Sequence, residues 1–280
     1  MSLLRAACIQ MRATPDVMPN IEASTTLIRA AARDGATFVA TPEMTNILDI
    51  RPGQARTRIA TEADDLCLRA LCDLASELRI TLLIGSLAVA LPGDERFANR
   101  SYLIGPTGDV LGRYDKIHMF DVEVGDGQAY RESNAYRAGR NATLVHSPIG
   151  RVGMTICYDV RFPHLYRGLG QEGAQLITIP AAFTRVTGEA HWHVLVRARA
   201  IETGCFILAP AQGGQHEDGR ETFGHSLIVS PWGEILAEAD HDMPGFIIAD
   251  LDLAEVARAR ARIPALKNDQ RFSVSTAPTA

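Results

Sequence analysis

Along most of its 280 residues, this chain alternates short apolar runs rich in β-branched residues with amphipathic segments. Such alternation of strands and helices is typical of α/β folds. A helix is predicted to begin at a cap residue, Asn20, and to run to about Arg33. Further helices are expected over residues 64–79 and near 189–203. The predicted strands include residues 3–10, 36–41, 81–89, 152–156, 175–180 and 205–210.

A second pattern, an apolar run followed by Pro-x-Gly and another apolar run, occurs three times. Proline presets φ for the second position of a tight turn, and glycine accepts the left-handed backbone that follows. Each occurrence therefore predicts a β-hairpin, centred on residues 106–108, 148–150 and 231–233. Because hairpins pair strands antiparallel, the sheets are predicted to be mixed rather than purely parallel.

Length and composition indicate an ordinary globular protein. The chain is expected to form one domain over residues 1–280, with a core of about 3–266 and a polar C-terminal tail. The chain has 46% hydrophobic and 22% charged residues, a composition that excludes collagen, coiled coil and intrinsic disorder. The 28 basic and 33 acidic residues leave a net charge of −5. We therefore expect no nucleic-acid partner, because binding to phosphates needs a basic face.

No membrane association or secretion is expected. The longest apolar stretch, residues 82–91, is interrupted by Gly85 and Ser86 and is far shorter than the roughly 20 residues that span a bilayer. The N-terminal MSLLRAACIQM lacks the features of a signal peptide. The five cysteines are odd in number and contain no CxxC. A reduced, cytoplasmic protein is therefore predicted.

Cys157 is the strongest candidate for chemistry. It follows the predicted strand 152–156, and Pro163 suits the first turn of the next helix. A thiol at a strand-to-helix turn lies near free N–H groups, which can stabilise a thiolate and later an oxyanion. Its neighbours are polar, although spacing alone does not prove a function. The other cysteines lie in apolar runs and are expected only to pack: Cys8, Cys67, Cys72 and Cys205.

Two more polar residues follow predicted strands. Glu43 comes after strand 36–41, and Lys116 comes after the second arm of the first hairpin. A lone glutamate or lysine is usually a solvated surface charge. However, Glu43, Lys116 and Cys157 all occupy the carboxyl ends of strands, where α/β proteins tend to build ligand sites.

The remaining motifs exclude several other chemistries. His191 and His193 are two residues apart on a predicted helix, so they point to different faces and make a poor metal pair. Neither HExxH nor the zinc-deaminase signature occurs, so no metal is expected. GHSLI is not GxSxG, which leaves a serine hydrolase unsupported. Because no GxGxxG follows a strand, no nucleotide cofactor is expected.

Three motifs resemble the Glu-Lys-Cys triad of the nitrilase, or carbon–nitrogen hydrolase, superfamily: TPEMTN, GRYDKIHMF and GMTICYDVRFPHLYR. They occur in the superfamily's order and with its flanking residues. The resemblance covers nearly the whole chain, to about residue 272. A later stretch looks like the Nit branch of small-amide hydrolases, PAAFTRVTGEAHWHVLVRARAIETGCFILAPAQGGQH. Within that branch, the sequence of this stretch is closer to that of the enzymes acting on deaminated glutathione than to that of the ω-amidases.

The resemblance implies a four-layer αββα sandwich and a homodimer, or a higher homo-oligomer, formed through helices near the cysteine. It also implies a second glutamate, which matches Glu132 in YRESNAY. The chain departs from the pattern at His193, where many relatives carry an acid. The C-terminal RIPALKNDQRFSV matches the basic ending of the relatives only loosely.

The activity implied by the resemblance is hydrolysis of a small linear primary amide to a carboxylate and ammonia, through a thioester and without a cofactor. In this hypothesis Cys157 is the nucleophile, and Glu43 transfers its proton. Lys116 and the Tyr158 backbone N–H would stabilise the oxyanion. Glu132 would orient Lys116 or the amide. Two carboxylates beside one thiol are expected to raise at least one carboxyl pKa.

A substrate with a distal carboxylate would need a cation at the mouth of the pocket, and Arg161 and Arg185 are the candidates. For Arg161, an ion pair with Asp159 or Glu172 is as good an interpretation as binding of the substrate carboxylate. For Arg185, a solvated charge in a loop is a better interpretation than binding. Phe183 and Trp192 could line the pocket, although packing is the simpler role. Residues 49–60, 121–140 and 183–190 are expected to form the pocket loops.

Alternatives remain open on the same triad: an ω-amidase for α-ketoglutaramate, an N-carbamoylase or a true nitrilase. From other classes, the alternatives are a catalytically silent interaction protein and a redox-sensing cysteine protein.

Overall fold

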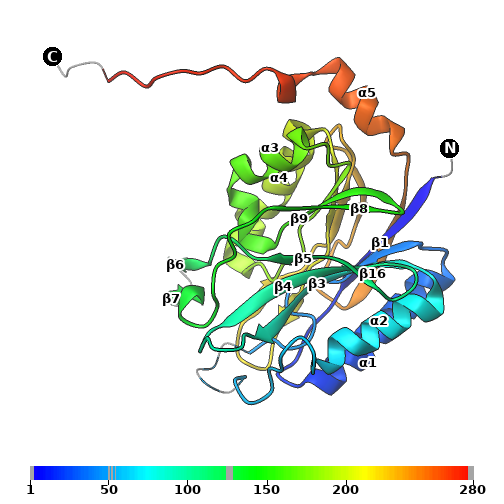
Figure 1. Cartoon of the computed structure of the whole chain (residues 1–280), viewed down its shortest axis with the longest axis vertical. Coiled ribbons are helices and arrows are strands. Elements are labelled where there is room, and N and C mark those ends of the chain that lie inside the picture. The colour runs from blue at the N-terminus through cyan, green and yellow to red at the C-terminus, as the bar shows by residue number, and fades with distance from the viewer. Residues whose placement is uncertain (1–2, 50, 52, 54, 124–128, 277–280) are drawn as a thin grey trace.

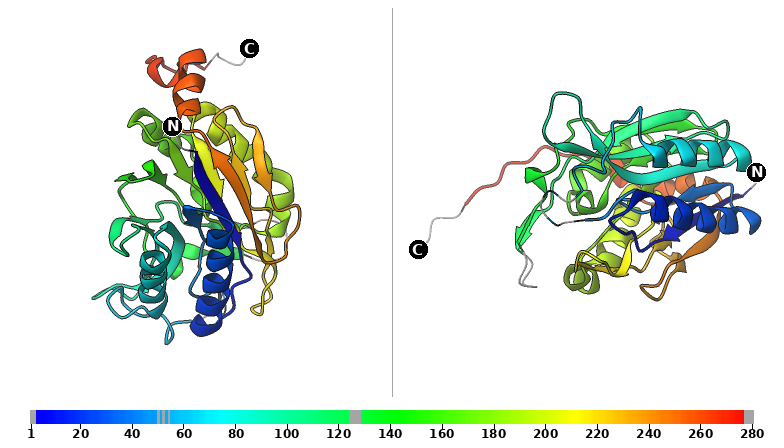
Figure 2. Two further views of the ribbon diagram at one scale, coloured as in Figure 1. Left: turned by 90° about the vertical axis from the view of Figure 1, so that its right-hand side faces the viewer. Right: turned by 90° about the horizontal axis from the view of Figure 1, so that it is seen from below.

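The computed structural model describes residues 3–49, 51, 53, 55–123 and 129–276. Two six-stranded sheets face each other, and helices cover their outer sides (Figures 1 and 2). This arrangement confirms the predicted αββα sandwich with mixed sheets. No helix in these described ranges is long and apolar enough to cross a membrane.

In the first sheet, β1, β2 and β3 run parallel, and the other neighbours pair antiparallel. A register shift between Ile84 and Leu87 interrupts the pairing of β3 with β4. The strands in spatial order are β16 (Gly245–Leu251), β1 (Leu4–Gln10), β2 (Phe38–Ala40), β3 (Thr81–Ala90), β4 (Phe97–Ile104) and β5 (Val110–Asp115). The C-terminal strand therefore completes this sheet beside the N-terminal one.

The second sheet has the same plan, a parallel centre of β9, β10 and β11 with antiparallel strands on both sides. Its strands in spatial order are β15 (Ile235–Glu238), β14 (Leu227–Val229), β11 (Phe206–Ala209), β10 (Leu176–Thr178), β9 (Gly150–Met154) and β8 (Thr143–Ser147). All three predicted hairpins are confirmed, as the pairs β4–β5, β8–β9 and β14–β15. The turn glycines Gly108, Gly150 and Gly233 have φ of +85°, +114° and +85°.

Helices α1 (Val17–Arg33) and α2 (Leu66–Leu78) pack on the first sheet, and α4 (Arg185–Thr203) packs on the second, with α3 (Pro163–Gln171) beside it. The C-terminal α5 (Ala254–Arg262) is followed by a short 3₁₀ helix, Ala265–Lys267, and an extended segment that projects from the body (Figure 1). Two small ribbons complete the structure: β6 (Asp121–Glu123) with β7 (Ala129–Arg131), and β12 (Gly213–Gln215) with β13 (Glu221–Phe223).

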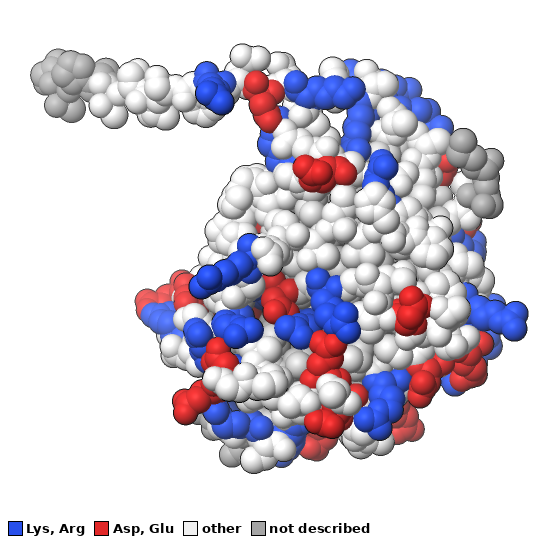
Figure 3. Space-filling model, viewed as in Figure 1, with Lys and Arg blue, Asp and Glu red and all other residues white. Residues whose placement is uncertain are grey.

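The core follows the period-two alternation of strand side chains. In β1, Ala6 and Cys8 face the space between the sheets, whereas Ala7 and Ile9 face α1 and α2. The apolar strand runs are thus buried on both faces. On the side of the molecule drawn in Figure 3, basic and acidic side chains are interspersed.

Three helix details differ from the predictions. α1 begins at Val17, so Asn20 is not its cap. Instead, buried Asn20 accepts from the Thr14 backbone N–H and donates to the Asn46 carbonyl. α2 begins at Leu66 rather than at residue 64, because Asp65 is its N-cap and accepts from the Leu68 N–H through its side chain. α4 begins at Arg185, four residues before its predicted start.

Candidate active site

Four predicted residues from separate parts of the chain meet at one end of the sandwich. Glu43 follows β2 and Lys116 follows β5 in the first sheet, whereas Cys157 follows β9 in the second. Glu132 begins a 3₁₀ helix, Glu132–Asn134, just after β7. Because the sheets face each other, residues that follow strands of different sheets come into contact.

Lys116 lies between two carboxylates. Its Nζ atom is 2.9 Å from Glu43 Oε1 and 2.9 Å from Glu132 Oε2. Only 2% of the lysine side chain is exposed, so the ammonium is removed from water almost completely. A buried ammonium requires paired charge and hydrogen bonds, and both carboxylates provide them.

Glu43 is fixed by contacts on both carboxylate oxygens. Oε1 accepts from Asn99 Nδ2 at 2.9 Å, in addition to Lys116, and Oε2 accepts from the Ala182 backbone N–H at 2.9 Å. The Cys157 thiol lies beside this carboxylate, because each group shifts the pKa of the other. The carboxylate is therefore placed next to the thiol whose proton a general base would remove.

The loop that carries Glu43 is fitted against an irregular part of β3. A Cβ added to Gly85 would lie 2.0 Å from the Thr41 carbonyl oxygen, so only glycine allows this approach. The next residue, Ser86, accepts from the Met44 backbone N–H through Oγ at 2.9 Å. The glycine and serine that interrupt the longest apolar run of the sequence thus hold this loop.

Cys157 lies at a tight turn between β9 and α3. Its φ is +48°, a left-handed conformation that costs a non-glycine residue about 1–3 kcal/mol. The turn is held because Cys157 N–H donates to the Pro180 carbonyl at 2.9 Å, and Asp159 accepts from the Ile156 N–H at 2.9 Å. Among the described residues, no acceptor takes the N–H of Tyr158. Pro163 opens α3, as predicted.

Electrostatics assigns a protonation state to each group. For Glu43, burial favours the protonated acid, but the charge of Lys116 and the hydrogen bonds outweigh it and lower the pKa. For Lys116, burial likewise opposes the charge, and Glu132 and Glu43 overcome it and raise the pKa. For Cys157, burial and the Glu43 charge raise the pKa well above its usual value. The resting site therefore holds a carboxylate, an ammonium and a neutral thiol.

Two sequence-based expectations are wrong here. The turn was expected to favour a thiolate, but burial beside a carboxylate keeps Cys157 protonated. The two carboxylates were expected to raise at least one carboxyl pKa, and for Glu43 this is wrong. Its pKa is lowered, because the charge and the hydrogen bond of Lys116, together with the hydrogen bond from Asn99, outweigh burial. The arrangement can thus supply a base for a neutral thiol.

Asn99 on β4 was missed by the sequence interpretation. Its Nδ2 donates to Glu43 at 2.9 Å and to Glu132 at 3.1 Å, so this buried side chain joins the two carboxylates. Its backbone carbonyl also accepts from the Lys116 N–H at 3.0 Å. No local motif marks this residue, because its partners are distant in sequence.

A cavity of about 620 Å³ opens onto this group. The described residues that line it include Glu43, Lys116, Glu132, Cys157, Tyr158 and Phe183. All three segments predicted as pocket loops contribute lining residues, but 121–123 and 129–131 form β6 and β7, and 185–190 belong to α4. Residues 50, 52, 54 and 124–128 of these segments lie outside the described part of the chain. Trp192, in contrast, is buried against Phe183, at 5.1 Å between ring centroids, and supports the wall from behind.

The two arginines predicted to bind a carboxylate are not among the described lining residues. Arg161 stacks over Phe183, 5.2 Å from the ring centroid, and its NH1 lies 3.3 Å from His191 Nδ1. Its alternative, an ion pair with Asp159 or Glu172, is not observed in the described structure either. Arg185 is the first residue of α4 and pairs with Asp242 at 2.6 Å, so it is not a solvated loop charge.

Other arginines line the cavity instead: Arg51, Arg56, Arg131 and Arg220. Arg51 pairs with Asp49 at 2.8 Å, and Arg131 pairs with Glu123 at 2.7 Å. Arg220 differs because its Nε is buried and has no hydrogen-bond partner in the described part of the chain. Since a buried donor without an acceptor is costly, Arg220 is the lining arginine best suited to an anionic ligand.

Comparison with known proteins places this geometry in context. Residues 5–261 match the model of a family described as carbon-nitrogen hydrolase. The chain is 40% identical over 268 residues to a deaminated glutathione amidase of Synechocystis, covering 94% of this chain and 97% of that protein.

Comparison with solved structures leads to the same family. The chain is similar to Nit3 of Saccharomyces cerevisiae, a member of the nitrilase superfamily, with a TM-score of 0.86, 27% identity and 97% of both chains covered. It is also similar to an amidase from Nesterenkonia, with a TM-score of 0.78, 25% identity and 94% of this chain and 96% of that chain covered. A mutant of that amidase carries the acetamide moiety of fluoroacetamide, added covalently at its active-site cysteine.

Proposed function

The chain belongs to the carbon–nitrogen hydrolase family, and from this premise we propose a cysteine-dependent amidase that acts on a small acid bearing a distal carboxylate. The family membership supports hydrolysis of carbon–nitrogen bonds other than peptide bonds. The observation that carries the proposal is the position of the buried Cys157 thiol beside the Glu43 carboxylate, which raises the pKa of the thiol and whose Oε1 lies 2.9 Å from Lys116 Nζ.

In the first half of the proposed reaction, Cys157 Sγ attacks the amide carbon while Glu43 takes the thiol proton. The carbonyl oxygen becomes an oxyanion, which Lys116 Nζ and the Tyr158 N–H stabilise. Glu43 then returns the proton to the leaving nitrogen, the C–N bond breaks, and a thioester remains on Cys157. General acid–base catalysis of this kind contributes roughly 10²–10⁴ in rate.

In the second half, Glu43 removes a proton from water, and the resulting hydroxide attacks the thioester carbon. The C–S bond breaks, the thiol regains its proton from Glu43, and the acid leaves. Glu132 keeps the Lys116 ammonium in place throughout. No metal or organic cofactor takes part in these steps.

The cavity supports a substrate of deaminated glutathione size. About 620 Å³ is within the range of about 300–1,000 Å³ that holds drug-sized ligands, and Arg220 is suited to a carboxylate in it. Deaminated glutathione carries a ketone where glutathione has its γ-glutamyl amino group. Hydrolysis of its γ-amide therefore yields 2-oxoglutarate and cysteinylglycine, so this substrate is a secondary amide rather than the primary amide expected from the resemblance.

The test is to measure 2-oxoglutarate released from deaminated glutathione and from α-ketoglutaramate, with the parent protein and with Cys157→Ala. We expect the parent to turn over deaminated glutathione faster and the variant to be inactive. The reverse preference would assign an ω-amidase. Release from neither compound, with activity on a carbamoyl compound or a nitrile, would refute the substrate class but keep the Cys157 chemistry.

Arg220→Leu tests the recognition of the carboxylate. We expect KM for deaminated glutathione to rise, with a smaller effect on an uncharged amide such as propionamide. His146→Ala, a change at an exposed residue of β8, is the surface control. An equal loss with charged and uncharged amides would contradict the role of Arg220.

We further propose that the protein is a homodimer joined through α3 and α4, in a reducing compartment. Apolar side chains exposed on α4 support this surface: Val186, Val194 and Ile201. The area over these helices is largely uncharged (Figure 3). All five cysteines are free thiols. Light scattering of the parent and of Val194→Glu distinguishes a dimer from a monomer.

A further inference from the structure

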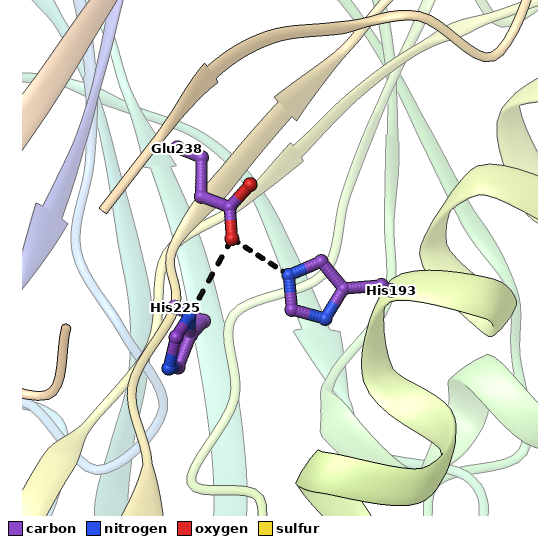
Figure 4. A group of neighbouring side chains, drawn as sticks. All are labelled: His193, His225 and Glu238. Atoms are coloured by element: carbon purple, nitrogen blue, oxygen red, sulfur yellow. Dashed lines mark hydrogen bonds and ion pairs between the residues drawn. The ribbon is translucent and has the colours of Figure 1, made fainter. Parts of the chain in front are cut away.

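A second group of ionisable side chains lies outside the proposed active site, between α4 and the edge of the second sheet. His193 comes from α4, His225 from the segment before β14, and Glu238 from the end of β15 (Figure 4). Glu238 Oε1 is 2.7 Å from His193 Nε2 and 3.5 Å from His225 Nδ1. None of the three lines the cavity that contains Cys157.

The three potential ligand atoms converge on one point. One nitrogen from each imidazole and one carboxylate oxygen all lie within 4.8 Å of one another. In a tetrahedral zinc site, bonds of about 2.0–2.2 Å place ligand atoms roughly 3.4 Å apart. The two contacts with Glu238, at 2.7 and 3.5 Å, lie on either side of this separation. Small side-chain rotations are therefore enough to admit a metal ion.

His225 is held in position before any ion binds. Its backbone has a φ of +52°, and its carbonyl accepts from Trp192 Nε1 at 2.8 Å. Its ring stacks on Phe223, with 4.2 Å between centroids and 20° between planes. Because Trp192 directly precedes His193, the same helical turn positions both histidines.

The burial of the group suits an ion that keeps one position for water. The side chains of His193, His225 and Glu238 are 33%, 24% and 29% exposed. They are sufficiently covered to restrict their rotamers, and sufficiently open for water to reach a fourth coordination position. Among the described residues, no lysine or arginine forms an ion pair with Glu238.

We propose that His193, His225 and Glu238 form a binding site for a divalent transition-metal ion of the zinc class, which ties α4 to the edge strand β15. Two imidazoles and one carboxylate are ligands that zinc accepts, whereas magnesium and calcium prefer oxygen ligands alone. The histidines bind as neutral imidazoles, so the affinity should fall as the pH is lowered. The ion would take no part in the Cys157 chemistry, because none of its three ligands lines the Cys157 cavity.

The experiment is calorimetric titration with ZnCl₂, carried out in the Cys157→Ala background because the Cys157 thiol could itself bind zinc. We expect one zinc ion per chain. His193→Ala and Glu238→Gln should each weaken binding at least tenfold, whereas His146→Ala, which removes an exposed histidine on β8, should leave it unchanged. MgCl₂ should give no binding.

Thermal unfolding provides a second measurement. Zinc should raise the midpoint of the Cys157→Ala protein, because a ligand of the folded state stabilises it by RT ln(1 + [L]/Kd). It should not do so in the His193→Ala variant, whose metal-free midpoint shows whether the variant folds. Absence of zinc binding, or binding that survives His193→Ala and Glu238→Gln, would overturn the proposal. Neither result bears on the Cys157 chemistry, which the 2-oxoglutarate assay tests separately.

Discussion

Two groups of ionisable side chains in this molecule are built alike and differ in burial. In the proposed active site, the side chains of Lys116, Glu43 and Glu132 are 2%, 6% and 13% exposed. At the edge of the second sheet, those of His193 and Glu238 are 33% and 29% exposed. Both groups join residues that are distant in sequence through a shared carboxylate oxygen.

Burial determines what each group can do. We call Lys116, Glu43 and Glu132 the inner group, and His193, His225 and Glu238 the outer group. Removing charges from water is costly, so the inner group is stable only when nearly every oxygen and N–H is paired, and this pairing keeps each residue in one protonation state. The outer group retains access to water, so its hydrogen bonds are weak and an ion can replace them. The inner group is thus suited to proton transfer, and the outer one to exchangeable binding.

The largest effect is expected from Glu43→Gln, which keeps the shape of the inner group but removes its base. The rate constant kcat should fall by roughly 10²–10⁴, because the thiol then has no acceptor for its proton. Steady-state release of 2-oxoglutarate measures this, with His146→Ala as the surface control. A loss below tenfold would show that another group accepts the proton.

The next largest effect is expected from Lys116→Met, which leaves Glu43 and Glu132 buried without their cation. The free energy of unfolding should fall by about 3–5 kcal/mol at pH 7. The loss should be smaller at pH 5, because the unpaired carboxylates can then take up protons. Urea unfolding at the two pH values measures this, and an equal loss at both would contradict the charge explanation.

Asn99→Leu tests a positioning residue of the inner group. Loss of two hydrogen bonds to carboxylates should cost about 1–3 kcal/mol of unfolding free energy. Because the Asn99 hydrogen bond helps to lower the pKa of Glu43, the acid limb of kcat/KM should also move to higher pH. A purely structural role would change stability and leave the pH profile in place.

The pH profile of the parent protein follows from the same balance. The pKa of Glu43 is lowered from its ordinary value of 4.5, so the base is ionised throughout the neutral range. Activity should be lost only as the pH falls below 4.5. The stability contributed by ionised Glu43 is present above 4.5 and is lost as the pH falls through the lower, folded-state pKa. An acid limb near pH 6 or above would contradict this assignment.

The smallest effect is expected in the outer group without metal. Glu238→Gln should change the unfolding free energy by only about 0–1 kcal/mol, as is usual for exposed ion pairs. Urea unfolding in the presence of a chelator measures this. A loss as large as that of Lys116→Met would show that exposure does not distinguish the two groups.

The sequence was informative where a structure depends on neighbouring residues. Alternating apolar runs predicted the α/β class, and each Pro-x-Gly motif predicted a hairpin that the structure contains. The positions of Glu43, Lys116 and Cys157 after predicted strands marked them as candidates. These signals are local, because strand period, turn conformation and chain direction depend on a few consecutive residues.

What the sequence could not predict depends on contacts between distant segments. Asn99 reaches Glu43 across 56 positions, and His193 reaches Glu238 across 45. Arg161 and Arg185 were wrongly predicted to bind the substrate carboxylate for the same reason. Arg185, for example, pairs with Asp242, which is 57 positions away in the sequence.

By itself, then, the sequence determined the fold class, the three hairpins, the family and the candidate residues of the site. Only the tertiary structure decided which of these residues meet and in which protonation state. A pKa depends on burial and on the distance to opposite charge, and the packing of the two sheets sets both. The same packing left one polar group enclosed around Lys116 and the other open at the edge of the second sheet.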